Sequence, residues 1–237
     1  MANWEEELLA ATLNDSDHKE VFRKIEAAAR ELGFEHCAYS TRMPWPFSRP
    51  RNHLLNNYPA AWQARYQEAG YQHIDPVVAH CRKSEAPLLW SGEVFANVPE
   101  FWQEAQSHGL RFGWSQSCLD ANGVGTGMLS LSRSTEPLLP DELAAKDGKM
   151  RWLVHISHLR LARTLAPQLH AKPGSLTSRE VEVLKWTGDG KTSSEISQIL
   201  VLSTDTVNFH LKNAVSKLGA ANKTAAVVCA AMMGMLN

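Results

Sequence analysis

Aromatic and acidic side chains gather between residues 58 and 90. Tyr58, Trp62 and Tyr66 follow one another at four-residue intervals, so in a helix Trp62 and Tyr66 share one face. Tyr and Trp each offer a large apolar surface with one polar group, which suits a small molecule that is partly polar and partly apolar. Asp75 can accept a hydrogen bond from a ligand N–H group, and Trp90 adds a further ring. The types and order of these residues therefore allow a binding site for a small molecule.

A structural interpretation of the same residues stays open. Trp62 and Tyr66 at helical spacing are also typical of a hydrophobic core. Asp75 followed by Pro76 is a good helix start, because proline favours the first helical position. Spacing alone favours these structural roles over a ligand site.

A second set of polar side chains lies on a predicted helix over residues 204–218. One stripe of this helix is apolar and packs inward; its members are Val207, Leu211, Ala214 and Leu218. A neighbouring stripe carries Asn208 and Lys212, with Phe209 beside it. Asn suits adenine, Lys suits guanine, and an apolar ring can meet a thymine methyl group. We predict that this stripe reads DNA bases, although for Asn208 and Lys212 alone a solvated face of a helical bundle is an equal alternative.

Further candidates for DNA contact carry a charge, a hydroxyl or an amide close to this helix. Groups of this kind usually bind phosphate and so set the position of a protein on the duplex. The candidates are Lys191, Thr192, Ser203, Thr204, Thr206, Asn213 and Lys217.

Start signals predict four short helices within residues 176–237. Thr177–Glu180 and Thr192–Glu195 fit the capping box, in which the Thr oxygen and the Glu carboxylate each satisfy a free backbone N–H. Ser203 opens a third helix and Asn222 a fourth. Each cap contributes about 0.5–2 kcal/mol, which makes four short helices plausible in so short a segment. Their order is that of a helix-turn-helix DNA-binding module.

The chain upstream of this tail mixes helices and strands. Helices are predicted at residues 4–13, 17–32, 60–70, 76–83, 98–108 and 140–165, and strands at His36–Arg42, Asn52–Asn56, Cys118–Asp120 and Thr126–Arg133. Short turns between strands, such as the one at Ala121–Gly123, favour an antiparallel sheet, and the flanking helices would cover both of its faces. We predict an α+β fold: an α-β-α sandwich in residues 1–165, a Pro/Gly linker at 166–175, and the helical module at 176–237.

The composition is that of an ordinary soluble protein. The chain has 237 residues, a formal net charge of −1 and 44% hydrophobic residues. Neither a signal peptide nor an apolar run long enough for a membrane span is present, so we expect a cytoplasmic protein. The four cysteines are scattered without metal-like spacing and are expected to be reduced and mostly buried. Residues 174–237 carry six Lys/Arg against five Asp/Glu, a weak positive charge that favours two copies acting together on a symmetric operator.

The tail resembles the LuxR-type helix-turn-helix. The resemblance rests on Leu176–Glu180, Gly190–Thr192, Glu195–Ile196, Thr206–Leu211, Lys217–Leu218 and Asn222–Lys223. It implies that the third helix reads the major groove, at positions that include 208 and 212, and that the fourth helix helps to pair two copies. The chain departs from the family pattern at Asn208, where Lys or Arg is common, and at Lys223, where Arg is usual.

Residues 30–135 resemble the acyl-homoserine-lactone-binding domains of quorum-sensing regulators. The matching residues are Tyr58, Trp62, Tyr66, Asp75–Pro76, Trp90, Gly109–Leu110 and Gly113. Arg42 with the Pro-rich loop after it, Asn56–Pro59 and Gly113–Ser115 are most similar to an orphan receptor of that family.

This resemblance implies a role for each candidate ligand residue. Trp62 would donate to the lactone carbonyl, Asp75 would accept from the ligand amide N–H, and Tyr58 would bond the acyl carbonyl. Tyr66 and Trp90 would enclose the head group and chain. Ser130, on the Met128/Ser130/Ser132 face of its strand, would supply another hydroxyl near the amide. Ala38 stands where some relatives have a serine.

These observations predict a ligand-responsive transcription factor without catalytic residues, metal site or cofactor. It would bind an N-acyl-homoserine lactone, act as a homodimer on a palindromic element of double-stranded DNA, and contact RNA polymerase if it activates transcription. A LuxR-type regulator of a different small molecule is the open alternative. A phosphorylation-controlled response regulator is disfavoured because the chain begins with helices and lacks β–α alternation. An enzyme is disfavoured because the chain has no G-x-S-x-G elbow and no metal-binding His set.

Overall fold

The computed structural model describes residues 5–6, 8–9, 17–43, 51–119, 126–169 and 175–236. The chain divides into two compact units, Met1–Ala166 and Pro167–Asn237. The last helix of the first unit, α6 (Pro140–Leu169), continues into the segment predicted as a linker. Residues 5–6 and 8–9 are helical, within the helix predicted at 4–13, and the rest of that prediction lies outside the described residues.

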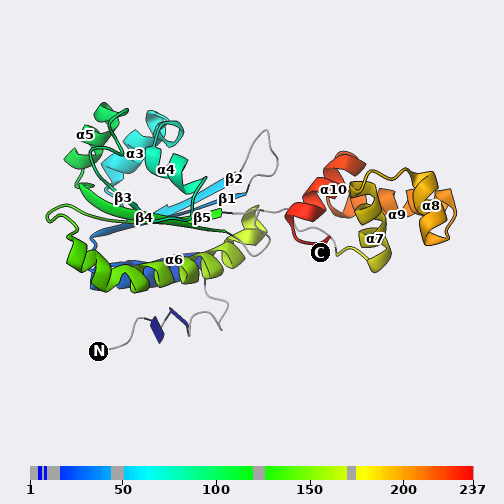
Figure 1. The fold of residues 1–237 in the computed structure, drawn as a ribbon, viewed down its shortest axis with the longest axis horizontal. Helices are drawn as coiled ribbons and strands as arrows, with labels where there is room; N and C mark the ends of the chain where they lie inside the picture. The colour runs from blue at the N-terminus through cyan, green and yellow to red at the C-terminus, as the bar shows by residue number, and fades with distance from the viewer. Residues whose placement is uncertain are drawn as a thin grey trace. The chain divides into compact units, whose positions relative to one another are not determined.

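The first unit is built on a five-stranded antiparallel sheet in the order β2-β1-β5-β4-β3. Its strands are β1 (His36–Met43), β2 (Arg51–Asn56), β3 (Leu88–Leu89), β4 (Phe112–Leu119) and β5 (Thr126–Arg133). Figure 1 shows α3 (Ala60–Glu68), α4 (Pro76–Cys81) and α5 (Pro99–Ser107) on one face of the sheet, and α2 (His18–Glu31) and α6 on the other. The predicted α+β fold with helices on both faces of an antiparallel sheet is therefore confirmed.

Three elements differ from the prediction. β4 begins at Phe112, whereas only Cys118–Asp120 was predicted as strand. The interior of β4 is buried on both faces and mixes Ser and Gln with apolar residues, so the alternation that marks a half-buried strand is missing. The two-residue strand β3 and the short 3₁₀ helix at Tyr71–His73 are too brief to leave a periodic pattern. The turn predicted at Ala121–Gly123 lies outside the described residues.

The alternation of side chains along β5 separates the main core from the opposite face of the sheet. Leu129 and Leu131 are fully buried, as are Leu153 and Leu161 of α6. A Cβ atom on Gly127 would collide with the His158 ring, so glycine at this position allows α6 to approach the sheet closely. Met128 and Ser130 point to the other face, which is covered by α3, α4 and α5.

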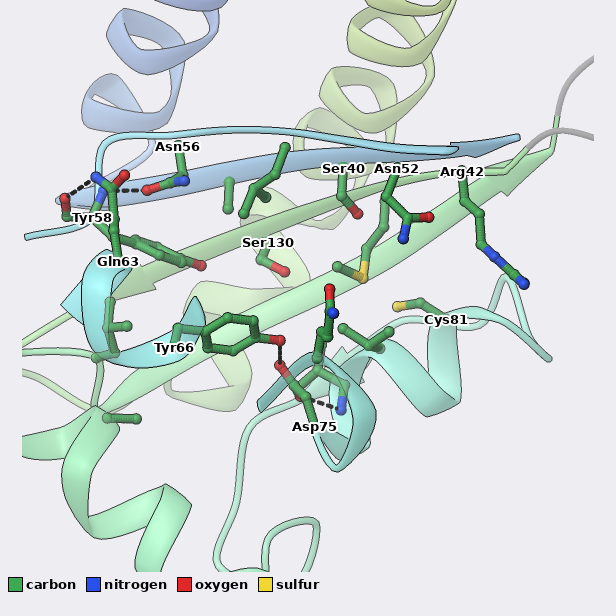
Figure 2. Close-up of a pocket in the computed structure, with 18 of the residues that line it drawn as sticks. Ser40, Arg42, Asn52, Asn56, Tyr58, Gln63, Tyr66, Asp75, Cys81 and Ser130 are labelled. Atoms are coloured by element: carbon green, nitrogen blue, oxygen red, sulfur yellow. Dashed lines mark hydrogen bonds between the residues drawn. The ribbon is translucent and has the colours of Figure 1, made fainter. Parts of the chain in front are cut away.

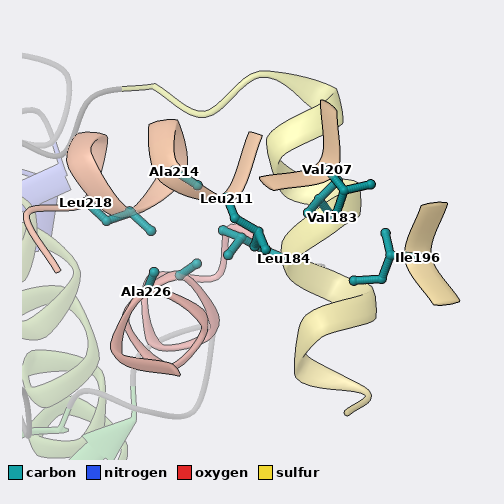
Figure 3. Packing of buried hydrophobic residues seen from close by; sticks show 9 residues of the cluster. Val183, Leu184, Ile196, Val207, Leu211, Ala214, Leu218 and Ala226 are labelled. Atoms are coloured by element: carbon teal, nitrogen blue, oxygen red, sulfur yellow. The ribbon is translucent and has the colours of Figure 1, made fainter. Parts of the chain in front are cut away.

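The second unit consists of α7 (Ser178–Gly188), α8 (Ser193–Leu200), α9 (Thr204–Lys217) and α10 (Lys223–Met232). The caps predicted from the sequence are confirmed: Thr177 and Thr192 complete capping boxes, and Ser203 and Asn222 accept from backbone N–H groups in the first turn. Figure 3 shows the buried cluster that joins these helices, formed by Val183, Leu184, Ile196, Val207, Leu211, Ala214, Leu218, Ala226 and Ala230. The apolar stripe predicted on α9 packs into this cluster, which leaves the opposite side of α9 exposed.

Candidate ligand cavity and DNA-reading helix

A cavity lies between the sheet and the layer formed by α3, α4 and α5 (Figure 2). Its wall includes all six residues predicted to bind ligand: Tyr58, Trp62, Tyr66, Asp75, Trp90 and Ser130. Residues that are far apart in the sequence thus meet around one cavity, where a small molecule could contact them together.

Trp62 and Tyr66 combine the two roles that the sequence left open. Trp62 is only 2% exposed and belongs to a buried aromatic cluster, in which its ring lies 5.8 Å from that of Tyr66 and 5.8 Å from that of Phe101, between centroids. Both residues also line the cavity. Packing on one side therefore holds the rings in place, and their other side faces the space that a ligand would fill.

Asp75 likewise has a structural role and faces the cavity. Its Oδ1 accepts a hydrogen bond of 2.8 Å from the backbone N–H of Val77, which makes it the N-cap of α4. Its Oδ2 accepts a hydrogen bond of 2.9 Å from the Tyr66 hydroxyl, as Figure 2 shows. Two fixed donors orient the carboxylate and leave lone pairs for a further N–H group.

Burial changes the acid–base behaviour of this pair. Removal from water raises the pKa of Asp75 above its usual range, and the hydrogen bonds from Tyr66 and the backbone oppose only part of that rise. Burial, followed by the charge of Asp75, also raises the pKa of Tyr66, whose hydroxyl therefore stays protonated and donates. An additional N–H donor from a ligand would stabilise the ionised carboxylate.

A chain of hydrogen bonds crosses the sheet beside Asp75. The indole N–H of Trp90 donates to Ser115 Oγ at 2.9 Å, and Ser115 Oγ lies 2.7 Å from Ser130 Oγ. A Cβ atom on Gly113 would collide with the Trp90 ring, so this glycine lets the indole lie flat against β4. Ser115 was missed as a member of the site, although its place two residues after Gly113 put it on the same strand face.

Tyr58 closes the cavity at the start of α3. The side-chain amide of Gln63 donates to its carbonyl oxygen at 2.7 Å, and Asn56 Oδ1 accepts from its backbone N–H at 3.1 Å. Burial raises the pKa of the Tyr58 hydroxyl, so this group remains a donor over the physiological pH range. Ala38 lines the same space and contributes no hydroxyl there.

The predicted base-reading stripe lies on the outer side of α9. Asn208 and Lys212 are exposed, and the Phe209 side chain is 60% exposed. An exposed phenylalanine does not serve the core of this small unit, which favours a contact surface over a merely solvated face.

Several of the predicted phosphate contacts have a structural role within the unit. The Thr192 and Ser203 hydroxyls cap α8 and α9, and Thr206 Oγ1 lies 2.8 Å from Ser203 Oγ. Lys217 Nζ lies 2.8 Å from Oε2 of Glu180, whose side chain is nearly completely buried. A phosphate would compete with that carboxylate for Lys217. Asn213 is half-buried, Thr204 is exposed, and Lys191 lies 3.8 Å from Glu195 on the surface.

Other chemical features of the described residues are few. The four cysteines are free and buried, as predicted. Within the described part of the chain, no group of three His, Cys, Asp or Glu side chains could hold a metal ion. None of the helices described has the length and apolarity needed to cross a membrane.

Two family models match the chain in the order of its two units. Residues 17–161 match the autoinducer binding domain, and residues 174–230 match the model for bacterial regulatory proteins of the luxR family. The transcriptional activator protein AnoR of Acinetobacter nosocomialis is 42% identical over 239 residues, covering 100% of both chains.

Solved structures extend this similarity to three dimensions. A structure of SdiA, a regulatory protein of Escherichia coli, in complex with octanoyl-rac-glycerol matches with a TM-score of 0.85 and 35% identity over 99% of this chain and 96% of that one. The N-acylhomoserine lactone dependent factor CepR2 of Burkholderia cenocepacia matches with a TM-score of 0.60 and 31% identity over 68% of this chain and 97% of that one. These relatives are regulators of transcription, not enzymes. The chain thus belongs to the LuxR family of bacterial regulatory proteins, with an autoinducer-binding domain ahead of a LuxR-type helix-turn-helix.

Proposed function

We propose that the protein is a cytoplasmic quorum-sensing transcription factor that binds an N-acyl-homoserine lactone and acts as a homodimer on a palindromic promoter element. The observation that carries the proposal is Asp75, a half-buried carboxylate at the cavity wall, oriented by Tyr66 and Val77 and still able to accept an N–H bond. An acylated amide provides such an N–H next to an apolar chain. The similarity to CepR2, which is named as dependent on this ligand class, supports the same choice.

The proposed arrangement of the head group uses the side chains that meet around Asp75. Asp75 accepts from the ligand amide N–H, Trp62 donates to the lactone carbonyl, and Tyr58 donates to the acyl carbonyl. Tyr66 and Trp90 enclose the head group and the start of the chain. Ser130, already held by Ser115, adds a hydroxyl near the amide.

In this proposal residues 1–165 bind ligand and dimerise, and residues 176–237 bind DNA. We call the first unit, Met1–Ala166, the sensor unit, and the second, Pro167–Asn237, the DNA-binding unit. Ligand binding stabilises the folded sensor unit by mass action, by about 2.7 kcal/mol at a ligand concentration one hundred times the Kd. Two copies of α9 then reach successive major grooves, about 34 Å apart. Asn208, Phe209 and Lys212 read bases there, and the nearby Lys, Asn and hydroxyl groups contact phosphates. If the protein activates transcription, RNA polymerase is a further partner.

A thermal-shift panel on the full chain tests the ligand class. The panel contains acyl-homoserine lactones with chains of four to fourteen carbons, a vehicle, and the ring-opened form of each ligand as a matched control. We expect a saturable rise in Tm for a subset of chain lengths and a smaller rise for the ring-opened forms. No shift with any lactone, from a protein that is folded and dimeric alone, would contradict the proposal.

A second candidate ligand is a monoacylglycerol, because a relative with 35% identity forms a complex with octanoyl-rac-glycerol. Such a ligand has an ester in place of the amide and so offers Asp75 a glycerol hydroxyl instead of an N–H. Octanoyl glycerol therefore belongs in the same panel. A larger shift with the glycerol ester than with every lactone would favour this second candidate.

A further inference from the structure

The cavity has a second polar region, at a distance from Asp75. In the sheet register, Arg42 of β1 lies opposite Asn52 of β2 and Thr126 of β5, and all three residues line the cavity. Figure 2 shows Arg42 and Asn52 at the end of the cavity opposite to Tyr58. Three neighbouring strands, β2, β1 and β5, therefore carry polar side chains at this end, and we call Asn52, Arg42 and Thr126 the distal row.

The register also sets the separation between the two polar regions. Ala38 lies opposite Asn56 and Ser130, in the row next to the proposed head-group site. Arg42 is four residues further along the same strand face, so the backbones of the two rows are about 13 Å apart. Between them, Ser40 lies opposite Leu54 and Met128, in a row with two apolar members. An extended chain would pass over this middle row before it reaches the distal row.

Arg42 has unused hydrogen-bonding capacity at the distal row. Its Nε atom is buried and has no hydrogen-bond partner. Among the described residues that line the cavity, Asp75 is the only carboxylate, whereas Arg42 and Arg82 both carry a positive charge. A buried cationic N–H group without an acceptor is costly, and a purely hydrocarbon tail would exclude water from it without replacing the lost hydrogen bond.

We propose that the distal row recognises a hydrogen-bond acceptor oxygen in the outer half of the ligand's acyl chain, with Arg42 as its main donor and Asn52 as a second. This inference rests on the proposed function, because it takes the lactone head group to lie at Asp75. It adds a class of ligand: chains with an oxygen, such as a hydroxyl or an oxo group, far from the amide. Arg42 would thus determine specificity for the tail as Asp75 does for the head group.

The test compares matched ligands on the full chain by titration calorimetry. Each pair consists of a plain acyl-homoserine lactone and its ω-hydroxy analogue, in chains of eight, ten and twelve carbons. Because a hydrogen bond to a charged donor is stronger than one between neutral groups, we expect about tenfold tighter binding of the hydroxylated member at the chain length that reaches the row. Arg42→Met should abolish this preference by raising the affinity for the plain member, because the variant removes the buried N–H that a hydrocarbon tail leaves without an acceptor.

Arg111→Met is the matched control, since it removes the same charge from an exposed arginine that does not line the cavity. This variant should keep the wild-type preference. Asn52→Leu should reduce the preference without abolishing it.

The outcomes separate this inference from the proposed function. If the wild type binds the plain lactones as tightly as the hydroxylated ones at every length, the inference is wrong and the lactone site stands. A preference that persists in Arg42→Met also overturns it. If no lactone of either kind binds the wild type, the proposed function fails and the inference fails with it. The wild-type comparison remains decisive even if Arg42→Met does not fold.

Discussion

The two units of the chain build their functional surfaces in different ways. In the DNA-binding unit the decisive contacts are local: each cap joins residues three apart, and α9 alone carries the proposed reading stripe. In the sensor unit the cavity depends on sheet register, which brings Trp90, Ser115 and Ser130 into one hydrogen-bonded chain. Local rules therefore describe the first surface, whereas the second exists only once the strands have paired.

The largest predicted effect is a loss of stability in the DNA-binding unit that leaves the sensor unit folded. Leu184 is fully buried in the cluster that joins α7 to α10. Leu184→Ala should destabilise the DNA-binding unit by about 2–5 kcal/mol, because a cavity replaces the buried side chain. Scanning calorimetry of the full chain, compared with a ligand-binding assay at each temperature, should show early melting of this unit alone. An equal loss of ligand affinity would show that the two units do not fold independently.

The next effect concerns the ligand. Asp75→Asn keeps a good helix cap but removes the charged acceptor. We expect a loss of about 1.5–3 kcal/mol in ligand affinity, roughly ten- to one-hundredfold in Kd by calorimetry, with operator binding by the folded protein unchanged. Asp205→Asn, an exposed aspartate of the first turn of α9, is a control for the charge and should leave ligand affinity at the wild-type value. An unaltered ligand response in Asp75→Asn would remove Asp75 from the site.

Two lysines on α9 offer a finer comparison within the DNA-binding unit. Lys217 pairs with the nearly buried Glu180, whereas Lys212 is exposed. Lys217→Met should cost about 1–3 kcal/mol of stability, because it leaves a buried carboxylate without its partner. Lys212→Met should leave Tm unchanged and weaken specific DNA binding, measured by fluorescence anisotropy on operator and scrambled duplexes. If Lys217→Met is as stable as the wild type, the ion pair is not structural and a phosphate contact becomes the better assignment.

The same contrast explains how much of the molecule could be predicted from its sequence. The caps at Thr177, Thr192, Ser203 and Asn222 were predictable because each signal and its partner lie within one helical turn. β5 was predictable because its residues alternate between the core and the cavity. β4 was not, since both of its faces are buried and polar residues such as Ser115 and Gln116 lie inside.

The sequence indicated which residues belong to the candidate site, but it did not indicate how they lie relative to one another. Residue types and spacing could not decide whether Trp62 and Asp75 are structural or face a ligand, and the structure shows that each is both part of the fold and part of the cavity wall. The hydrogen bond of Trp90 to Ser115 joins residues 25 apart, and it forms because Trp90 directly follows β3, which pairs with β4. The distal row at Arg42 depends on register in the same way.

The smallest predicted effect is a pH dependence that arises from Asp75 in the sensor unit. Burial raises the pKa of Asp75 above its ordinary value of 3.8, so in the free protein the neutral form is favoured by folding. The contribution of neutral Asp75 to the free energy of unfolding is therefore present at low pH. It is lost as the pH rises from 3.8 through the raised pKa of the folded protein. Ligand affinity should rise over the same pH range, because the amide N–H of the ligand binds the ionised carboxylate. Binding to the protonated protein then releases a proton.

Other carboxylates give the free energy of unfolding the opposite pH dependence, so their effect has to be subtracted. Hydrogen bonds from Arg133 lower the pKa of Glu142 to about 2, so its stabilising contribution is present at neutral pH and is lost in acid. The difference between the wild type and Asp75→Asn isolates the effect of Asp75, since Glu142 is common to both. Calorimetry in buffers of different ionisation enthalpy should detect proton release on ligand binding by the wild type and none by the variant. An identical proton release in both proteins would mean that the ligand does not engage Asp75, and the sensor unit would then need another polar anchor within the same cavity.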